Sequence, residues 1–150
     1  MSGKKLLIVV LLGLVLAGGV FAHDGFFRGT LNFGILFAPG GGNTPPIMMV
    51  DADYINKYGI TFGLTQGITM GDDMVFLAGF SFGYTFARPK WALGIKLVGV
   101  GFGGDDGTGG FEIGGSFFFN NYIGITAMFD AFVFGDGRLF SIRGGLTIKI

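Results

Sequence analysis

Apolar and polar side chains alternate along the chain in eight separate stretches, and residues 138–150 show the pattern most plainly. The apolar face of this stretch carries Phe140, Ile142, Gly144, Leu146, Ile148 and Ile150. The other face carries Leu139, Ser141, Arg143, Gly145, Thr147 and Lys149. Because successive side chains of a β-strand point to opposite faces, the pattern predicts a strand with one apolar face and one polar, cationic face.

The same period of two predicts seven further strands. They span residues 27–38, 47–55, 58–70, 74–86, 91–102, 111–119 and 122–134. Segments rich in Pro, Gly, Asn or Asp separate them, at 39–46, 56–57, 71–73, 87–90, 103–110, 120–121 and 135–137. Gln66 interrupts the apolar face of the third strand, either near its far end or at a bulge beside Gly67.

The bulk and charge of the two faces indicate which one points outward. The apolar face is the bulkier one and carries no charge except Arg138 at a strand end, whereas the polar face is mostly Gly, Ser and Thr. Lipid would explain an uncharged exterior, since a Lys or Arg on the lipid face near the midplane costs about 2–4 kcal/mol. Only a closed barrel satisfies the backbone of every strand in lipid. We therefore predict an all-β fold, an eight-stranded antiparallel up-and-down transmembrane β-barrel, with a soluble secreted barrel as the alternative.

Composition and the first residues agree with an exported membrane protein. Only 13% of the residues are charged, about half of the usual share. Lys4 and Lys5 precede an apolar run over 6–16 and a small-x-small site at 20–22, which is typical of a signal peptide. An uncleaved anchor is the alternative, but the run is shorter than the roughly 20 residues of a spanning helix. We expect residues 1–22 to be a cleaved signal peptide and residues 23–150 to form the barrel.

Charge and cysteine content exclude several functions. Without Lys4 and Lys5, eight of the ten cations remain against ten acids, a net charge of −2. Because nucleic-acid binding needs a basic surplus, we expect no nucleic-acid partner. The chain has no Cys, which excludes disulfides, thiolate metal sites and a cysteine nucleophile.

The positions of the tyrosines and the single tryptophan indicate the orientation of the barrel. If the start of the barrel lies in the periplasm, the turns at 56–57, 87–90 and 120–121 are periplasmic and the longer connections are extracellular, as outer-membrane barrels require. Amphipathic rings favour a membrane interface. The aromatic residues beside the three periplasmic turns are Tyr54, Tyr58, Tyr84, Trp91 and Tyr122.

Over residues 27–150 the chain resembles the small eight-stranded outer-membrane barrels of the OmpA transmembrane-domain, OmpX and OmpW type. The resemblance rests on the signal, the eight alternating strands, the short periplasmic turns and the C-terminal strand. Those families usually end in an aromatic residue, where this chain has Ile150. The resemblance implies export by the general secretory route to the outer membrane of a diderm bacterium. It also implies a monomer surrounded by outer-membrane lipid and an assembly machinery that reads the C-terminal strand.

Charged side chains on the inward face are expected to pair with one another inside the barrel. They are Arg28, Asp51, Asp53, Lys96, Glu112, Asp130, Arg143 and Lys149. We expect one group at similar heights on successive strands (Lys96, Glu112, Asp130, Arg143) and a second group near the seam between the first and last strands. An eight-stranded interior has room only for side chains or one small ligand, which favours a plugged lumen over a gated ion path.

Candidate chemistry elsewhere is sparse. The single histidine, His23, precedes the barrel, so Ser81, Ser116 and Ser141 have no base to activate them, and we expect neither an enzyme nor a cofactor. The glycines of 99–104 are spaced as in a phosphate-binding turn, but no helix follows them. Five loop acids could bind divalent cations or simply be solvated, so we assign no metal site. These acids are Asp72, Asp73, Asp105, Asp106 and Asp136.

The sequence thus favours a structural or surface-interaction role for an outer-membrane barrel. The alternative is a porin-like transporter of small hydrophobic molecules of the OmpW type, which would need an apolar inner pocket. The inward apolar residues that could line such a pocket are Met49, Leu77, Val98, Phe118, Met128 and Phe132.

Overall fold

The computed structural model describes residues 25–40, 45–71, 74–102, 107–134 and 137–150. The expected signal peptide and the five loop acids named above lie outside the described residues. No helix among the described residues is long and apolar enough to cross a membrane.

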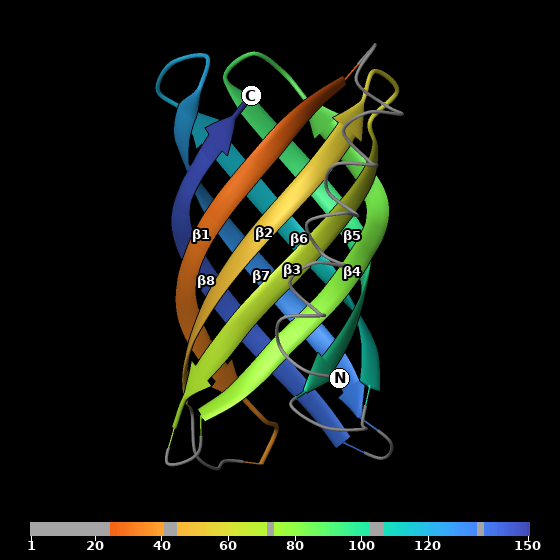
Figure 1. Ribbon diagram of the computed structural model, residues 1–150, viewed down its shortest axis with the longest axis vertical. Helices are drawn as coiled ribbons and strands as arrows, with labels where there is room; N and C mark the ends of the chain where they lie inside the picture. The colour runs from red at the N-terminus through yellow and green to blue at the C-terminus, as the bar shows by residue number, and fades with distance from the viewer. Residues whose placement is uncertain (1–24, 41–44, 72–73, 103–106, 135–136) are drawn as a thin grey trace, which may run out of the picture.

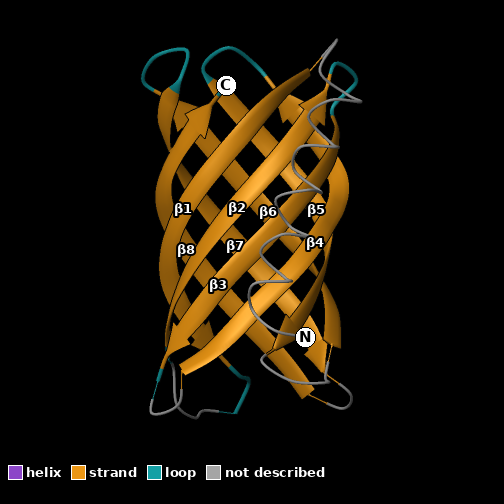
Figure 2. Ribbon diagram, viewed as in Figure 1, coloured by secondary structure: helices purple, strands orange, loops and turns teal. Residues whose placement is uncertain are grey.

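Eight antiparallel strands form one closed barrel in which each strand pairs with its neighbours in the chain and β1 pairs with β8 (Figures 1 and 2). The strands are β1 Gly25–Phe37, β2 Pro46–Asn56, β3 Ile60–Met70, β4 Met74–Ala87, β5 Trp91–Phe102, β6 Gly107–Phe118, β7 Ile123–Phe134 and β8 Gly137–Lys149. The predicted fold class is confirmed.

The seam between β1 and β8 closes the barrel along almost the full length of both strands. Their register runs from Arg28 opposite Lys149 to Phe37 opposite Phe140. Beyond that ladder, the Phe27 amide donates to the Ile150 carbonyl at 2.9 Å, and the Ile150 amide donates to the Phe27 carbonyl at 2.8 Å. Closure leaves no strand edge with unpaired backbone groups, which is the condition for a β-structure to stand in lipid.

Three connections at one end of the barrel are short, and we call this end the turn end. They are residues 57–59, 88–90 and 119–122, and the C-terminus of β8 lies beside them at the top of Figure 1. Asn56 Oδ1 accepts hydrogen bonds from the amides of Tyr58 and Ile60, both at 2.9 Å, while Gly59 adopts φ of 87°. Because residues 57–59 form this turn, β3 begins at Ile60, two residues after the start predicted at residue 58. The opposite end is called the loop end.

Four predicted boundaries differ at the loop end. β1 ends at 37 instead of 38, β8 starts at 137 instead of 138, and the starts of β6 and β2 also differ. The residues Gly107–Gly110 were expected in a loop, but they belong to β6 and pair with β5, with Gly110 opposite Val98. Their side chains carry no apolar alternation, yet backbone pairing does not need one. Pro46 was expected in a loop as well, but it is the first residue of β2, a position where the missing amide does no harm.

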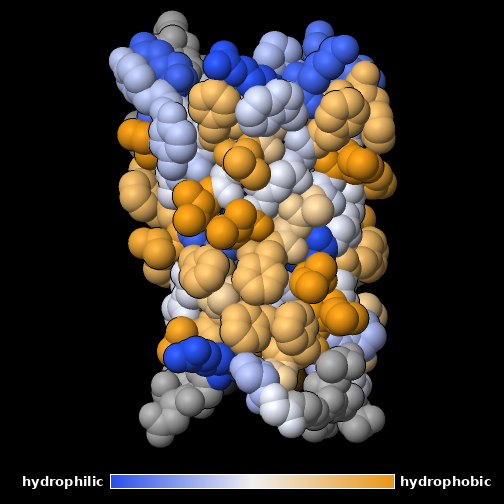
Figure 3. All heavy atoms as spheres, turned by 180° about the vertical axis from the view of Figure 1, so that it is seen from behind, coloured by the Kyte–Doolittle hydropathy of each residue, from blue (hydrophilic) through white to orange (hydrophobic). Residues whose placement is uncertain are grey.

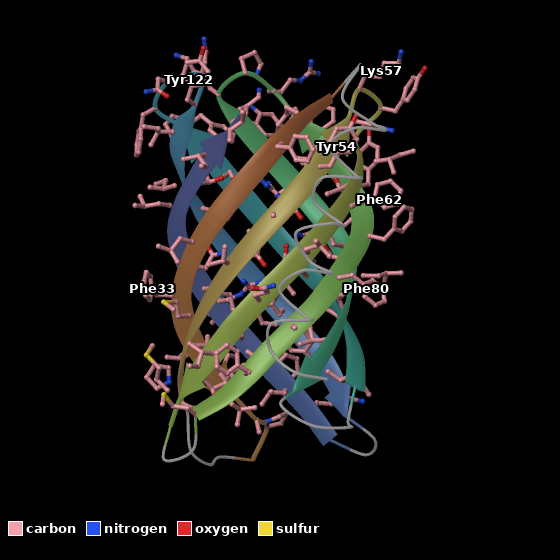
Figure 4. The ribbon with its side chains drawn as sticks, in the orientation of Figure 1. Phe33, Tyr54, Lys57, Phe62, Phe80 and Tyr122 are labelled. Carbon is pink, nitrogen blue, oxygen red and sulfur yellow. The ribbon has the colours of Figure 1, made fainter. Side chains whose placement is uncertain are left out.

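The barrel is apolar outside and buries charged side chains inside, the reverse of a soluble protein. Phe33, Phe62 and Phe80 project from the wall, with Phe80 68% exposed, and apolar residues cover most of the wall below a hydrophilic band at the upper rim (Figures 3 and 4). Gln66 also lies on the outer face, within an unbroken register that sets it opposite Val50 and Ala78, so β3 has no bulge there.

Candidate functional site

Seven of the eight predicted inward charges meet in the middle of the lumen. Alternation points them inward, and the register then aligns them across strands. Lys96 on β5 lies opposite Glu112 on β6, which lies opposite Asp130 on β7. All seven side chains are buried. We call this set the lumen network: Arg28, Asp51, Asp53, Lys96, Glu112, Asp130 and Arg143.

Arg143 is the hub of the lumen network. Its Nη1 lies 3.1 Å from Asp51 Oδ2, and its Nη2 lies 2.8 Å from Glu112 Oε2. Its Nε and Nη2 donate to the two carboxylate oxygens of Asp130 at 2.7 and 2.8 Å. This two-point contact matches the planar fork of the guanidinium to the carboxylate, the strong form of an ion pair. Arg143 and Asp130 both belong to the group of charges predicted at similar heights, and the structure pairs them.

The network then crosses the lumen from β8 to β1. Glu112 bridges Arg143 and Lys96, whose Nζ lies 2.8 Å from Glu112 Oε1 and 3.0 Å from Asp53 Oδ1. Asp53 in turn accepts from Arg28, at 2.6 Å from Nη2. We expected two separate groups at different heights, but the structure joins them into one. The interior is narrow enough for Lys96 on β5 to reach Asp53 on β2.

Neutral polar side chains complete the shell around the carboxylates. Thr65 donates to Asp51, Ser141 donates to Asp130, and Asn32 Nδ2 donates to Asp51 Oδ2 at 2.7 Å. The sequence analysis considered Ser141 only as a possible nucleophile, and it did not name Thr65 or Asn32. Thr65 lies opposite Asp51 and Ser141 lies opposite Asp130 in the register. These contacts could therefore be predicted only once the pairing of the strands is known.

Lys149 does not belong to the lumen network, which corrects our prediction. Its Nζ lies 4.4 Å from the centre of the Phe26 ring and 6.0 Å from that of Phe118, at the turn end. The register explains this position, because Lys149 lies directly opposite Arg28, which already pairs with Asp53. Two like charges side by side on adjacent strands repel.

A layer of apolar side chains fills the lumen between the network and the loop end. It consists of Leu36, Ile47, Met49, Leu77, Val98, Val100 and Phe132. Of the residues that could have lined an apolar transport pocket, Phe118 and Met128 lie elsewhere. Phe118 is beside Lys149, and the Met128 Sδ is 3.5 Å from Asn32 Nδ2. Each member of the layer is at most 5% exposed, so the layer is packed rather than open.

Four of the five predicted interfacial aromatic residues are exposed at the turn end. These are Tyr58, Tyr84, Trp91 and Tyr122. Tyr54 differs, since it is buried and its ring centre lies 5.1 Å from that of Phe27, its partner across the β1–β2 ladder. Figure 4 shows Tyr122 at the rim and Tyr54 lower on the barrel. The role of these rings at a membrane interface stays a prediction.

The described residues show little else that could carry chemistry. Ser116 accepts from Arg28 Nη1 at 3.5 Å and Ser141 donates to Asp130, so both hydroxyls belong to the surroundings of the ion pairs. Among these residues, no group of three or more His, Cys, Asp or Glu side chains is placed to hold a metal ion. The single histidine, His23, lies outside the described residues.

Comparison with known proteins identifies the fold. No protein-family model and no curated protein sequence matches this chain. Neisserial surface protein A, from Neisseria, superposes with a TM-score of 0.60 at 15% identity, covering 84% of this chain and 97% of that one. The N-terminal barrel domain of OprF from Pseudomonas aeruginosa gives 0.61 at 11% identity, with coverages of 85% and 100%.

A barrel designed de novo is as similar as the natural ones. A structure described as a de novo designed transmembrane β-barrel gives a TM-score of 0.63 at 8% identity, covering 85% of this chain and 96% of that one. At such identities the likeness concerns the fold, and a designed barrel adopts it too. The chain thus has the fold of the small eight-stranded transmembrane β-barrels.

Proposed function

We propose that this chain is an integral protein of the outer membrane of a diderm bacterium, with a structural or surface-interaction role and a lumen closed to solutes. The observation that carries this proposal is the combination of an apolar outer wall with a lumen crossed by seven paired charges. Neisserial surface protein A, a structural neighbour, is by its name a surface protein.

The outer wall supports a lipid environment. Soluble monomers rarely expose contiguous apolar patches of more than a few hundred Å², yet here bulky apolar side chains are exposed on all eight strands. The strands have 11 to 14 residues, which is enough for the roughly 9–11 that a tilted spanning strand needs. The partner of this wall is therefore outer-membrane lipid, and no second copy is needed to cover it.

The lumen supports a closed barrel. An ion that crossed it would have to displace paired charges from their partners in a low-dielectric interior, and breaking one such pair costs about 3–5 kcal/mol. Beyond the network, the apolar layer would strip the ion of its water. Two successive barriers of different chemistry thus oppose conduction.

Export and assembly complete the proposal. Residues 1–22 serve as a cleaved signal for the general secretory route, and residues 23–150 form the barrel. The assembly machinery reads the C-terminal strand, in which Ile150 takes the place of the usual aromatic residue. The function requires no catalysis, cofactor or nucleic acid.

Heat-modifiable gel migration, followed by bilayer recordings, tests this proposal. Barrels in an outer-membrane fraction should migrate as a compact form unless boiled, and the purified protein should give no stepwise conductance in planar bilayers. Extraction of the chain by salt alone would contradict the membrane assignment, whereas reproducible conductance steps would contradict the closed lumen.

The apolar layer favours one second candidate, transport of small hydrophobic molecules. Seven apolar side chains gather at the loop end of the lumen, where a lipophilic solute could enter if they moved apart. Proteoliposomes separate the two functions. Uptake of a labelled hydrophobic solute above that of protein-free vesicles would establish transport, and equal rates would leave the closed barrel.

A further inference from the structure

The centre of the β1–β8 seam has no facing pair in which both residues carry a side chain. Three successive pairs of its ladder each contain a glycine: Asn32 faces Gly145, Phe33 faces Gly144 and Gly34 faces Arg143. Facing side chains on neighbouring strands are a main source of sheet stability, and glycine supplies none. The two seam strands therefore hold their own middle section together by backbone hydrogen bonds alone.

One carboxylate oxygen bridges this part of the seam from inside the barrel. Asp51 Oδ2, on β2, accepts a hydrogen bond from Asn32 Nδ2 on β1 at 2.7 Å and lies 3.1 Å from Arg143 Nη1 on β8. The ion pair between Arg143 and Asp51 therefore passes over β1, and both strands of the seam donate to the same oxygen. All three side chains are buried. Because hydrogen bonds to a charged group are the strong ones, separating β1 from β8 has to break a strong contact.

The bridge belongs to a closed circuit of ion pairs. From Asp51 the circuit runs through Arg143 to Glu112, whose Oε2 lies 2.8 Å from Arg143 Nη2. The other oxygen of Glu112 lies 2.8 Å from Lys96 Nζ, which in turn lies 3.0 Å from Asp53 Oδ1. Asp53 and Asp51 are on the same strand, so the circuit returns to β2. It ties β2, β5, β6 and β8 together and thereby fixes the arc of wall that contains the seam.

The hairpin of β3 and β4 lies outside this circuit. Neither strand carries a charged side chain, and the contact of β3 with the network is a neutral hydrogen bond from Thr65 to Asp51. Beside the hairpin, the β4–β5 ladder is as rich in glycine as the seam: Ala78 faces Gly101, Gly79 faces Val100 and Phe80 faces Gly99. Figure 1 shows this ladder at the right of the barrel and the seam at the left. The barrel thus has two similar ladders, of which charges bridge only the seam.

We propose that the lumen network is a latch that keeps β1 and β8 together, so that β4 separates from β5 before β1 separates from β8. Without the network the opposite order is expected. The turn at 88–90 joins β4 to β5, whereas almost the whole chain lies between β1 and β8, and the entropy cost of closure grows with the length of the connection. The bridge from Asp51 to Arg143 offsets this disadvantage. The latch goes beyond the proposed function, because it would act in micelles as well as in a bilayer.

Hydrogen exchange of backbone amides, followed by NMR on the full chain folded in micelles, tests the latch. The readout is the ratio of protection between amides bonded across the seam and amides bonded across the β4–β5 ladder, so that a change in global stability cancels. Asp51→Asn removes the charge that bridges the seam. Asp53→Asn is the matched control, because it removes the same charge from the same face of β2, where the partners are Arg28 and Lys96.

We expect the seam amides of the wild type and of Asp53→Asn to exchange about tenfold more slowly than those of the β4–β5 ladder, the least that a hydrogen bond to a charged group contributes. In Asp51→Asn the ratio should fall by about the same factor. Equal protection of the two ladders in the wild type, or an equal fall of the ratio in Asp53→Asn, would overturn the proposal. The comparison within the wild type needs no variant, so it decides the matter even if Asp51→Asn fails to fold.

Discussion

Arg143 contacts carboxylates from three other strands, β2, β6 and β7, and its side chain is only 1% exposed. Replacing it with Met would keep an unbranched side chain and leave Asp51, Glu112 and Asp130 without their shared cation. Removing one partner of a buried pair costs about 3–5 kcal/mol, because the remaining charge is buried without compensation. We expect Arg143→Met to lower the free energy of unfolding in micelles by that amount, measured by urea titration with gel shift as the readout.

Lys149→Met is the matched control for this experiment. Lys149 lies on the same strand and carries the same charge, but it contacts rings instead of carboxylates. Its replacement should change the free energy of unfolding by no more than about 1 kcal/mol, the usual value of an exposed cation–π contact. If both variants lose the same stability, the lumen network has no special part in holding the barrel together.

Gln66 is a polar side chain on the outer face of β3, between strands whose facing residues are Val50 and Ala78. In lipid it has no water to bond, and an unbonded polar group in an apolar environment costs about 1–3 kcal/mol. We expect Gln66→Leu to raise the free energy of unfolding in lipid by that amount. Gln66→Asn, which keeps the amide, should have little effect, and a destabilised Gln66→Leu would indicate a hidden polar partner.

At the scale of the strand, alternation predicted all eight elements because each strand has one bulky and one small face. The prediction failed where side chains carry no pattern, as at Gly107–Gly110, which the backbone ladder of β5 holds in place. It also failed at Asn56, whose side chain bonds the amides of Tyr58 and Ile60 and so ends β2 later and starts β3 later than expected. Both errors arise from backbone bonds that hydropathy does not report.

Gly63 shows how β3 makes room for the network on neighbouring strands. A Cβ built on Gly63 would collide with Asp53 Oδ1 and Ser81 Oγ. Adding a methyl group to a packed interior usually costs about 1–3 kcal/mol. We therefore expect Gly63→Ala to lower the free energy of unfolding by that amount. Gly144→Ala is the control, since its added Cβ would meet nothing closer than the Thr126 carbonyl oxygen at 3.7 Å. Equal stability of the two variants would mean that Asp53 can move aside.

For the whole molecule, the members of the network were predictable but their connections were not. Alternation is enough to point Arg28, Lys96 and Arg143 inward. The contact between Lys96 and Asp53 joins β5 to β2 across the lumen, so it depends on closure of the sheet and on the tilt of the strands. The same holds for Lys149, which was expected in the network until the β1–β8 register set it opposite Arg28. Pairing across a barrel is a property of the closed sheet and is not contained in any one strand.

The closed lumen that we propose predicts how the stability of the whole barrel responds to salt. Exposed charges are screened strongly when the ionic strength rises from about 0.1 to about 1 M, whereas buried pairs are screened much less. The lumen network is buried in the wild type. The stability lost in Arg143→Met should therefore be nearly the same at both salt concentrations, differing by no more than about 1 kcal/mol. The measurement is the same urea titration, carried out on both proteins at each salt concentration.

A loss that shrinks steeply with salt would mean that ions reach Arg143 and its partners. It would therefore indicate a water-filled path along the lumen and favour conduction over a closed barrel.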